Sequence, residues 1–144
     1  MIQFTYQNPI PVSLTLLHKQ WLKELIRREN RTPGDIIYFF CDDEYLHSQN
    51  VQFLQHDTLT DIITFDEGVG DMVQGNIMIS YDRVKDNAAD FRVSEQEELL
   101  RVVAHGVLHL CGYKDKTDEE AKLMRQKEAE ALNLYSEMLN HKNQ

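Results

Sequence analysis

The sequence has few cysteines and no long apolar run. Two cysteines, Cys41 and Cys111, occur among 144 residues, and both lie in apolar segments. No stretch approaches the roughly 20 apolar residues that a membrane-spanning helix needs, and the N-terminus carries no recognisable secretory signal. We therefore expect a cytoplasmic protein with free thiols and with no membrane partner.

Positive charge and proline are also scarce. The chain has 15 Lys and Arg residues against 24 Asp and Glu residues, which gives a formal net charge of -9. This balance argues against a protein that coats nucleic acid indiscriminately, although it leaves room for a local basic groove. Only three prolines, no repeats and no low-complexity tract interrupt the chain, so we expect one domain that covers residues 1–144.

Hydrophobic spacing and turn signals indicate a mixture of strands and helices. Apolar runs predict four strands, at residues 2–6, 36–41, 62–65 and 76–80. Caps and apolar stripes predict helices from Ser13 to about residue 29, at 42–54, 82–91 and 94–110, and after Thr117. Residues 32–34 are expected to form a turn, and residues 67–75 a hairpin loop. The pattern favours an α+β domain, in which about five helices pack on one four-stranded mixed sheet.

Two histidines lie four residues apart in a helix that is apolar on nearly every face. At about 3.6 residues per turn, His105 and His109 share one side of this helix, so both imidazoles can reach one ion. Gly112 follows the last periodic residue, where glycine suits the left-handed conformation that ends a helix. Asp115 then lies on the returning chain. The pattern H-x-x-x-H-x-x-G-x-x-D has the spacing of a catalytic metal site with three protein ligands and an open fourth position.

Two residues close to the histidines limit which groups can bind the metal or act as a general base. Cys111 is a poor ligand candidate, because its side chain points about 200° away from that of His109 around the helix. Residue 106 is glycine, whereas zinc peptidases with an H-E-x-x-H motif have their glutamate base there. The motif therefore predicts no catalytic group beyond a metal-bound water molecule, and a general base must come from that water as hydroxide, from elsewhere in the chain or from the substrate. A metallopeptidase or another zinc hydrolase remains an alternative on ligand spacing alone.

The segment HGVLHLCGYKD at residues 105–115 resembles the signature of the YbeY-type endoribonucleases, which are ribosomal RNA maturation factors. The resemblance extends upstream. Residues 57–65, DTLTDIITF, resemble the family's D-x-P-T-D-V-L-S-F, and residues 75–77 resemble its G-D-I before a strand. These motifs cover most of residues 50–113 in the family's order and spacing. Within them, Thr60 and Asp61 could shape a cleft, although turn capping is the simpler interpretation.

The chain departs from the family pattern at two positions. Asp115 stands where the family usually has a third histidine; a carboxylate also binds zinc, and its harder oxygen admits other divalent metals. Leu54 stands where the family has an arginine, four residues after the position of Asn50. Another cation would then have to neutralise phosphate. The candidates are Lys114, Lys116 and a ridge formed by Lys19, Lys23 and Arg27, for which a solvated helix face is the simpler interpretation.

The resemblance implies a metal-dependent endoribonuclease that cuts single-stranded RNA. It would act in ribosomal RNA maturation, notably at the 3′ end of 16S RNA, and in ribosome quality control, with the small ribosomal subunit as partner and no DNA substrate. The implied ligands are His105, His109 and Asp115, and the expected cofactor is one Zn²⁺ per chain. The negative net charge and Leu54 favour a third hypothesis, a non-catalytic ribosome-assembly factor with a structural metal.

Overall fold

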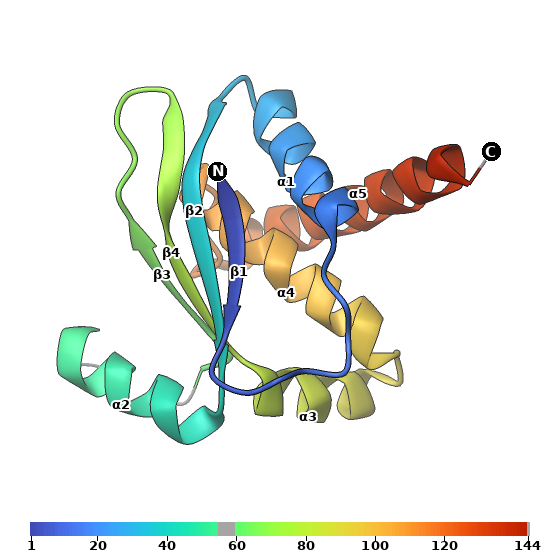
Figure 1. Cartoon of the computed structure of the whole chain (residues 1–144). Coiled ribbons are helices and arrows are strands. Elements are labelled where there is room, and N and C mark those ends of the chain that lie inside the picture. Colours follow the sequence, from blue (N-terminus) through green and yellow to red (C-terminus); the bar gives the residue numbers. More distant parts are fainter. Residues whose placement is uncertain (55–59, 144) are drawn as a thin grey trace.

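Four strands form one mixed sheet in the computed structural model, which describes residues 1–54 and 60–143, without the side chains of residues 53 and 54. The strands are β1 (Ile2–Tyr6), β2 (Thr32–Cys41), β3 (Ile62–Asp66) and β4 (Met72–Ser80), and their spatial order is β1-β2-β4-β3. β1 and β4 each pair in parallel with β2, whereas β3 pairs antiparallel with β4. β1 and β3 are therefore the two edges of the sheet (Figure 1).

Within the described residues, five helices cover this sheet. They are α1 (Leu16–Arg28), α2 (Asp43–Leu54), α3 (Tyr81–Phe91), α4 (Glu95–Leu110) and α5 (Asp118–Lys142). α1, α4 and α5 pack around the face that carries Ile36, Tyr38 and Ile77, whereas α2 packs on the opposite face, over Ile63 and Met78. Figure 1 shows α2 on its own side of the sheet, apart from α1, α4 and α5. The α+β class expected from the sequence is confirmed.

α4 lies close against the sheet because one of its central residues is glycine. A Cβ atom at Gly106 would lie 3.0 Å from side-chain carbons of Ile77 and 3.1 Å from one of Ile62. These distances are shorter than ordinary contacts between carbon atoms. Any larger residue at this position, including the glutamate of zinc peptidases, would therefore require Ile77 and Ile62 to shift by a few tenths of an ångström.

Three local predictions are wrong. Residues 32–34 begin β2 rather than forming a turn, because they run alongside β4 and a register irregularity before Ile36 accommodates them. β4 correspondingly starts at Met72, earlier than expected. α1 begins after Thr15 rather than Ser13, because the Thr15 N–H donates to Nδ1 of His18 over 2.9 Å in a capping box. None of the described helices combines the length and the apolar character needed to cross a lipid bilayer.

Candidate functional site

A cavity of about 530 Å³ opens at the β3 edge of the sheet. Residues from α2, β3, α4 and the segment that joins α4 to α5 surround it. Its lining consists of Asn50, Thr60, Asp61, Ile62, Ile63, Thr64, Arg101, Val102, His105, His109, Asp115 and Lys116. The three predicted metal ligands thus lie in one cavity, two of them on α4 and the third on the segment that follows it.

The His105 ring contacts a buried carboxylate of α5 through its Nδ1 atom. Its Nδ1 atom lies 2.7 Å from Oε2 of Glu128. The His105 side chain is 15% exposed and that of Glu128 only 5%. Since an ionised carboxylate can only accept hydrogen bonds, Nδ1 is the donor in this pair. The other ring nitrogen, Nε2, lies 3.4 Å from Oδ2 of Asp115.

Arg101, one turn before His105 on α4, joins Glu128 to a second buried glutamate. Its guanidinium donates one hydrogen bond of 2.9 Å to Oε1 of Glu128 and two, of 2.9 and 2.6 Å, to the carboxylate of Glu98. Burial acts to raise the pKa of Glu128, but the hydrogen bond from His105 and the charge of Arg101 together hold this pKa below its usual value. Formally, two carboxylates face one guanidinium, which leaves one excess negative charge beside His105.

The opposite side of the cavity is more open. His109 lies one turn beyond His105, and the two rings are nearly parallel, with centroids 6.4 Å apart. Asp115 is 47% exposed and follows Gly112, whose φ of 109° reverses the chain at the end of α4 as the sequence predicted. Lys116 also lines the cavity, and within the described residues its ammonium group has no hydrogen-bond or ion-pair partner.

This set of donor atoms fits a divalent cation. Two imidazoles and a carboxylate are a combination that zinc uses at catalytic sites. With its Nδ1 donating to Glu128, His105 directs the lone pair of Nε2 toward the Asp115 carboxylate, and two facing acceptors need a cation or a proton between them. In the described part of the chain, however, no group of three or more His, Cys, Asp or Glu side chains is already arranged to hold a metal ion. The three-ligand site therefore stays a prediction.

Cys111 has the properties of a core residue rather than of a ligand. Its side chain packs against the main hydrophobic core. Burial is the largest influence on the thiol and raises its pKa to about 11, despite the opposing charge of Arg31. A metal-bound thiol would instead lose its proton readily.

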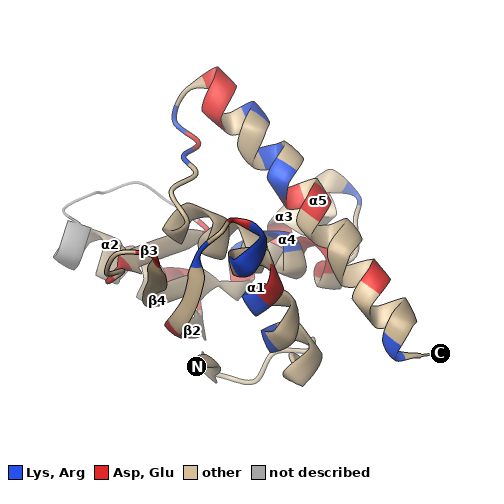
Figure 2. Cartoon of the chain, turned by 90° about the horizontal axis from the view of Figure 1, so that it is seen from above, with Lys and Arg blue, Asp and Glu red and all other residues tan. Residues whose placement is uncertain are grey.

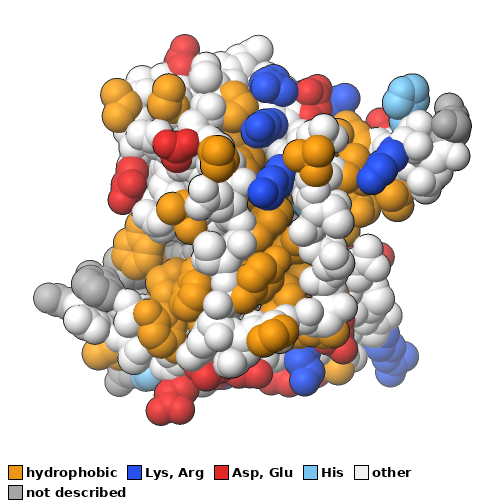
Figure 3. Space-filling view, in the orientation of Figure 1, with side chains coloured by type: hydrophobic (Ala, Val, Ile, Leu, Met, Phe, Trp, Pro, Cys, Tyr) orange, Lys and Arg blue, Asp and Glu red, His pale blue; other side chains and the backbone are white. Residues whose placement is uncertain are grey.

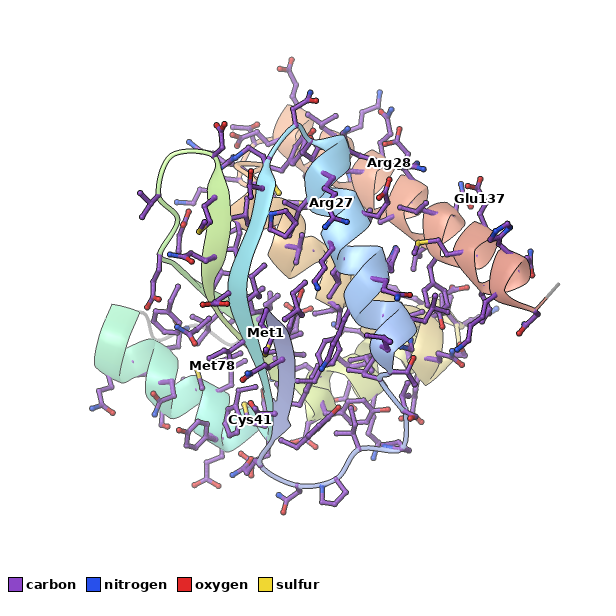
Figure 4. All side chains as sticks on the ribbon, turned by 45° about the horizontal axis from the view of Figure 1, so that its top comes forward. Met1, Arg27, Arg28, Cys41, Met78 and Glu137 are labelled. Atoms are coloured by element: carbon purple, nitrogen blue, oxygen red, sulfur yellow. The ribbon has the colours of Figure 1, made fainter. Side chains whose placement is uncertain are left out.

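The basic ridge of α1 does not reach the cavity. Lys19, Lys23 and Arg27 are absent from its lining. The Lys19 ammonium lies 6.0 Å from the ring centroid of Phe4 in β1, at the sheet edge opposite β3. Figure 2 marks several Lys and Arg positions along the α1 ribbon, Figure 3 shows Lys and Arg side chains gathered over α1, and Figure 4 labels Arg27 on this helix. The structure thus separates this ridge from the predicted metal ligands.

A larger hollow, of about 620 Å³, lies between α1 and α5. Apolar residues such as Leu17, Leu134 and Met138 form much of its lining, together with Arg28 and Glu137, which Figure 4 labels. It contains none of the predicted site residues. Size alone therefore does not identify the functional site, and the chemistry of the lining favours the cavity beside β3.

The structure locates some of the residues that the sequence analysis singled out, whereas others lie outside the described residues. Thr60 and Asp61 line the cavity, and the Thr60 hydroxyl also donates to the main chain of Ile62 over 3.2 Å, as a turn-capping residue does. The start of the upstream motif, residues 57–59, and the Leu54 side chain lie outside the described residues.

Sequence reasoning missed Glu98, Arg101 and Glu128. A signal was present for Glu128, because it lies four residues after Met124 and three before Ala131, on the buried stripe of α5. A glutamate on such a stripe is rarely buried without a partner. The identity of that partner, on another helix, could not be obtained from spacing within α5.

Comparison with known proteins identifies the class and the family. A family model described as Endoribonuclease YbeY matches residues 3–136. An Endoribonuclease YbeY from Flavobacterium johnsoniae is 52% identical over 94% of this chain and 97% of its own length. One from Christiangramia forsetii is 47% identical over 93% and 94%. The solution structure of TM1509 from Thermotoga maritima is similar with a TM-score of 0.69 and 27% identity, over 99% of this chain and 93% of that one.

These matches place the protein among the endoribonucleases, enzymes that cut RNA phosphodiester bonds within the strand. The chain belongs to the Endoribonuclease YbeY family. The family and the enzyme class expected from the sequence motifs are thereby confirmed.

Proposed function

We propose that the protein is a metal-dependent endoribonuclease that cuts single-stranded RNA during ribosomal RNA maturation. The observation that carries this proposal is the shared cavity of His105, His109 and Asp115, in which a buried carboxylate supports one imidazole from behind. Membership of the family supports RNA as the substrate. The further elements of the proposal are one Zn²⁺ per chain, action at the 3′ end of 16S RNA and in ribosome quality control, the small ribosomal subunit as partner, and a cytoplasmic location.

The residues of the cavity have different chemical roles in the proposed reaction. His105, His109 and Asp115 would hold the ion, which when bound supplies Lewis-acid activation of a phosphate and of water. Asp115 supplies a harder ligand than histidine, so manganese is an alternative to zinc. Asp61 is the remaining carboxylate among the described lining residues, and it is available to accept a proton during cleavage.

Lys116 replaces the arginine that the family pattern has at the position of Leu54. Two cations line the cavity among its described residues, Arg101 and Lys116. Arg101 already donates to two carboxylates, whereas the Lys116 ammonium has no partner within the described residues. Lys116 is therefore the cation that can meet a backbone phosphate without first losing an ion pair.

The dimensions of the cavity favour a single strand. A volume of about 530 Å³ is within the range of small-ligand pockets, and it suits individual nucleotides. Bases of a single strand can be splayed apart to enter such a site, whereas those of a duplex remain stacked inside the helix. The metallopeptidase alternative is disfavoured because residue 106 is glycine in place of the usual glutamate base, and the close packing around Gly106 leaves little space for a larger side chain.

Cleavage assays test the function directly. Zinc-loaded protein is incubated with single-stranded RNA, the same RNA in a duplex, and casein, each with and without a chelator. We expect cleavage of the single strand alone, loss of this cleavage with the chelator, and recovery on adding zinc. Casein cleavage without RNA cleavage would establish a peptidase instead. Intact RNA in every reaction would favour the assembly factor with a structural metal.

A further inference from the structure

We propose that Glu128 is a positioning residue that fixes the tautomer and the direction of the His105 ring, and that Arg101 in turn fixes Glu128. This inference deepens the proposed function and rests on it, because His105 is one of the predicted metal ligands. It concerns residues of α4 and α5 that no sequence motif connects.

Both oxygens of Glu128 are used by different partners. Oε2 lies 2.7 Å from Nδ1 of His105, and Oε1 accepts a hydrogen bond of 2.9 Å from Arg101. The carboxylate cannot rotate without losing one of these bonds. Arg101 is itself held by its two hydrogen bonds to Glu98, whose side chain is 2% exposed. The chain of bonds from Glu98 to His105 therefore has little freedom to rearrange.

This arrangement decides which nitrogen of His105 is available to a cation. A neutral imidazole carries its proton on either nitrogen, and the hydrogen bond made by one nitrogen selects the state of the other. Donation from Nδ1 to Glu128 leaves the lone pair on Nε2, the atom 3.4 Å from Asp115. A proton on Nε2 would block metal binding at this atom. A carboxylate behind the ring is a recurrent way to fix metal-binding histidines.

Two variants of Glu128 separate its acceptor function from its packing. Glu128→Met removes the acceptor and keeps a side chain of similar length, while Arg101 retains Glu98 as a partner. Glu128→Gln keeps one acceptor oxygen and loses the charge. Glu130→Met is the matched control, because Glu130 lies two residues further along α5 and is exposed. Circular dichroism verifies that each variant is folded.

The first measurement is the tautomer of His105 in the metal-free protein at pH 8, by NMR of ¹⁵N-labelled histidine. The His105 signal is identified by its loss in His105→Gln. We expect the Nδ1–H tautomer in the wild type and in Glu130→Met, and a shift toward Nε2–H in Glu128→Met. The same shift is expected in Glu128→Gln, because its single oxygen accepts from Arg101 and its amide N–H then faces Nδ1 of His105. The second measurement is zinc affinity by competition with a chelating dye. We expect a loss of about 10- to 100-fold in Glu128→Met, a smaller loss in Glu128→Gln and none in Glu130→Met.

An Nε2–H tautomer in the wild type would overturn the proposal, as would a Glu128→Met variant with unchanged tautomer and unchanged zinc affinity. If Glu128→Met does not fold, the tautomers of the wild type and of Glu128→Gln decide. Neither the tautomer nor the zinc affinity depends on RNA cleavage. A wild type with the Nδ1–H tautomer that nevertheless binds no zinc would contradict the proposed function alone, so the two failures can be distinguished.

Discussion

The two sides of the cavity are built in opposite ways. The fixed side consists of Glu98, Arg101, Glu128 and His105, which form a continuous chain of hydrogen bonds across α4 and α5. The open side consists of Asp115 and Lys116, which lie between these helices, and there Asp115 is 47% exposed. The fixed side can orient a ring in advance, whereas the open side presents charged groups that can meet a cation and a phosphate.

The two sides of the cavity are expected to contribute differently to folding stability and to metal binding. Burying two carboxylates around one guanidinium costs desolvation energy that their attraction only partly returns. The excess negative charge beside His105 favours a nearby cation. Substitutions on the fixed side should therefore change stability as well as metal binding, whereas those on the open side should change binding with little effect on stability.

The largest effect on stability is expected for Arg101→Met on the fixed side. The substitution leaves Glu98 and Glu128 buried without their shared cation. Because the Arg101 side chain is 29% exposed, we expect a loss of about 3 kcal/mol, at the lower end of the range for broken buried ion pairs. Urea unfolding measures it. Arg125→Met on the exposed surface of α5 is the control, with an expected change within about 0.5 kcal/mol. Equal losses in both variants would refute a special role for the buried network.

A smaller effect is expected at the boundary between the two sides. Thr117 caps α5 in a capping box with Glu120, directly after Lys116. Thr117→Ala should lower the free energy of unfolding by about 1 kcal/mol and weaken zinc binding, because it loosens the segment that carries Asp115. Ser94→Ala is the control, because it removes the N-cap of α4, fifteen positions before His109 in the sequence. It should lower the free energy of unfolding by a similar amount without weakening zinc binding. Equal zinc affinities in the two variants would show that the cap does not support Asp115.

The smallest effect on stability is expected for Lys116→Met on the open side. Unfolding should be unchanged, since the ammonium has no partner within the described residues. RNA affinity should fall, and the slope of log affinity against log salt should decrease by about 0.7, the value for one phosphate contact on a single strand. Lys114→Met is the matched control, two residues away on the same segment but outside the cavity lining. Identical slopes in the two variants would rule out a specific contact by Lys116.

The same division explains what could be predicted from the sequence. The predicted ligands follow from local rules: His105 and His109 from helical periodicity, and the bend before Asp115 from Gly112, which has the expected positive φ. The fixed side depends on Glu128 meeting α4, a contact between residues 23 positions apart that no periodicity encodes. The turn expected at residues 32–34 failed for a related reason, because pairing with β4 outweighs the local preference of proline and glycine.

The proposed metal site is tested most directly by the metal content of purified wild-type protein beside Asp115→Ala, measured by inductively coupled plasma mass spectrometry after equilibration with a small excess of zinc. We expect close to one zinc per wild-type chain and a large loss in the variant, with the fold of both verified by circular dichroism. Equal metal content in the two proteins, or none in the wild type, would contradict a site formed by His105, His109 and Asp115.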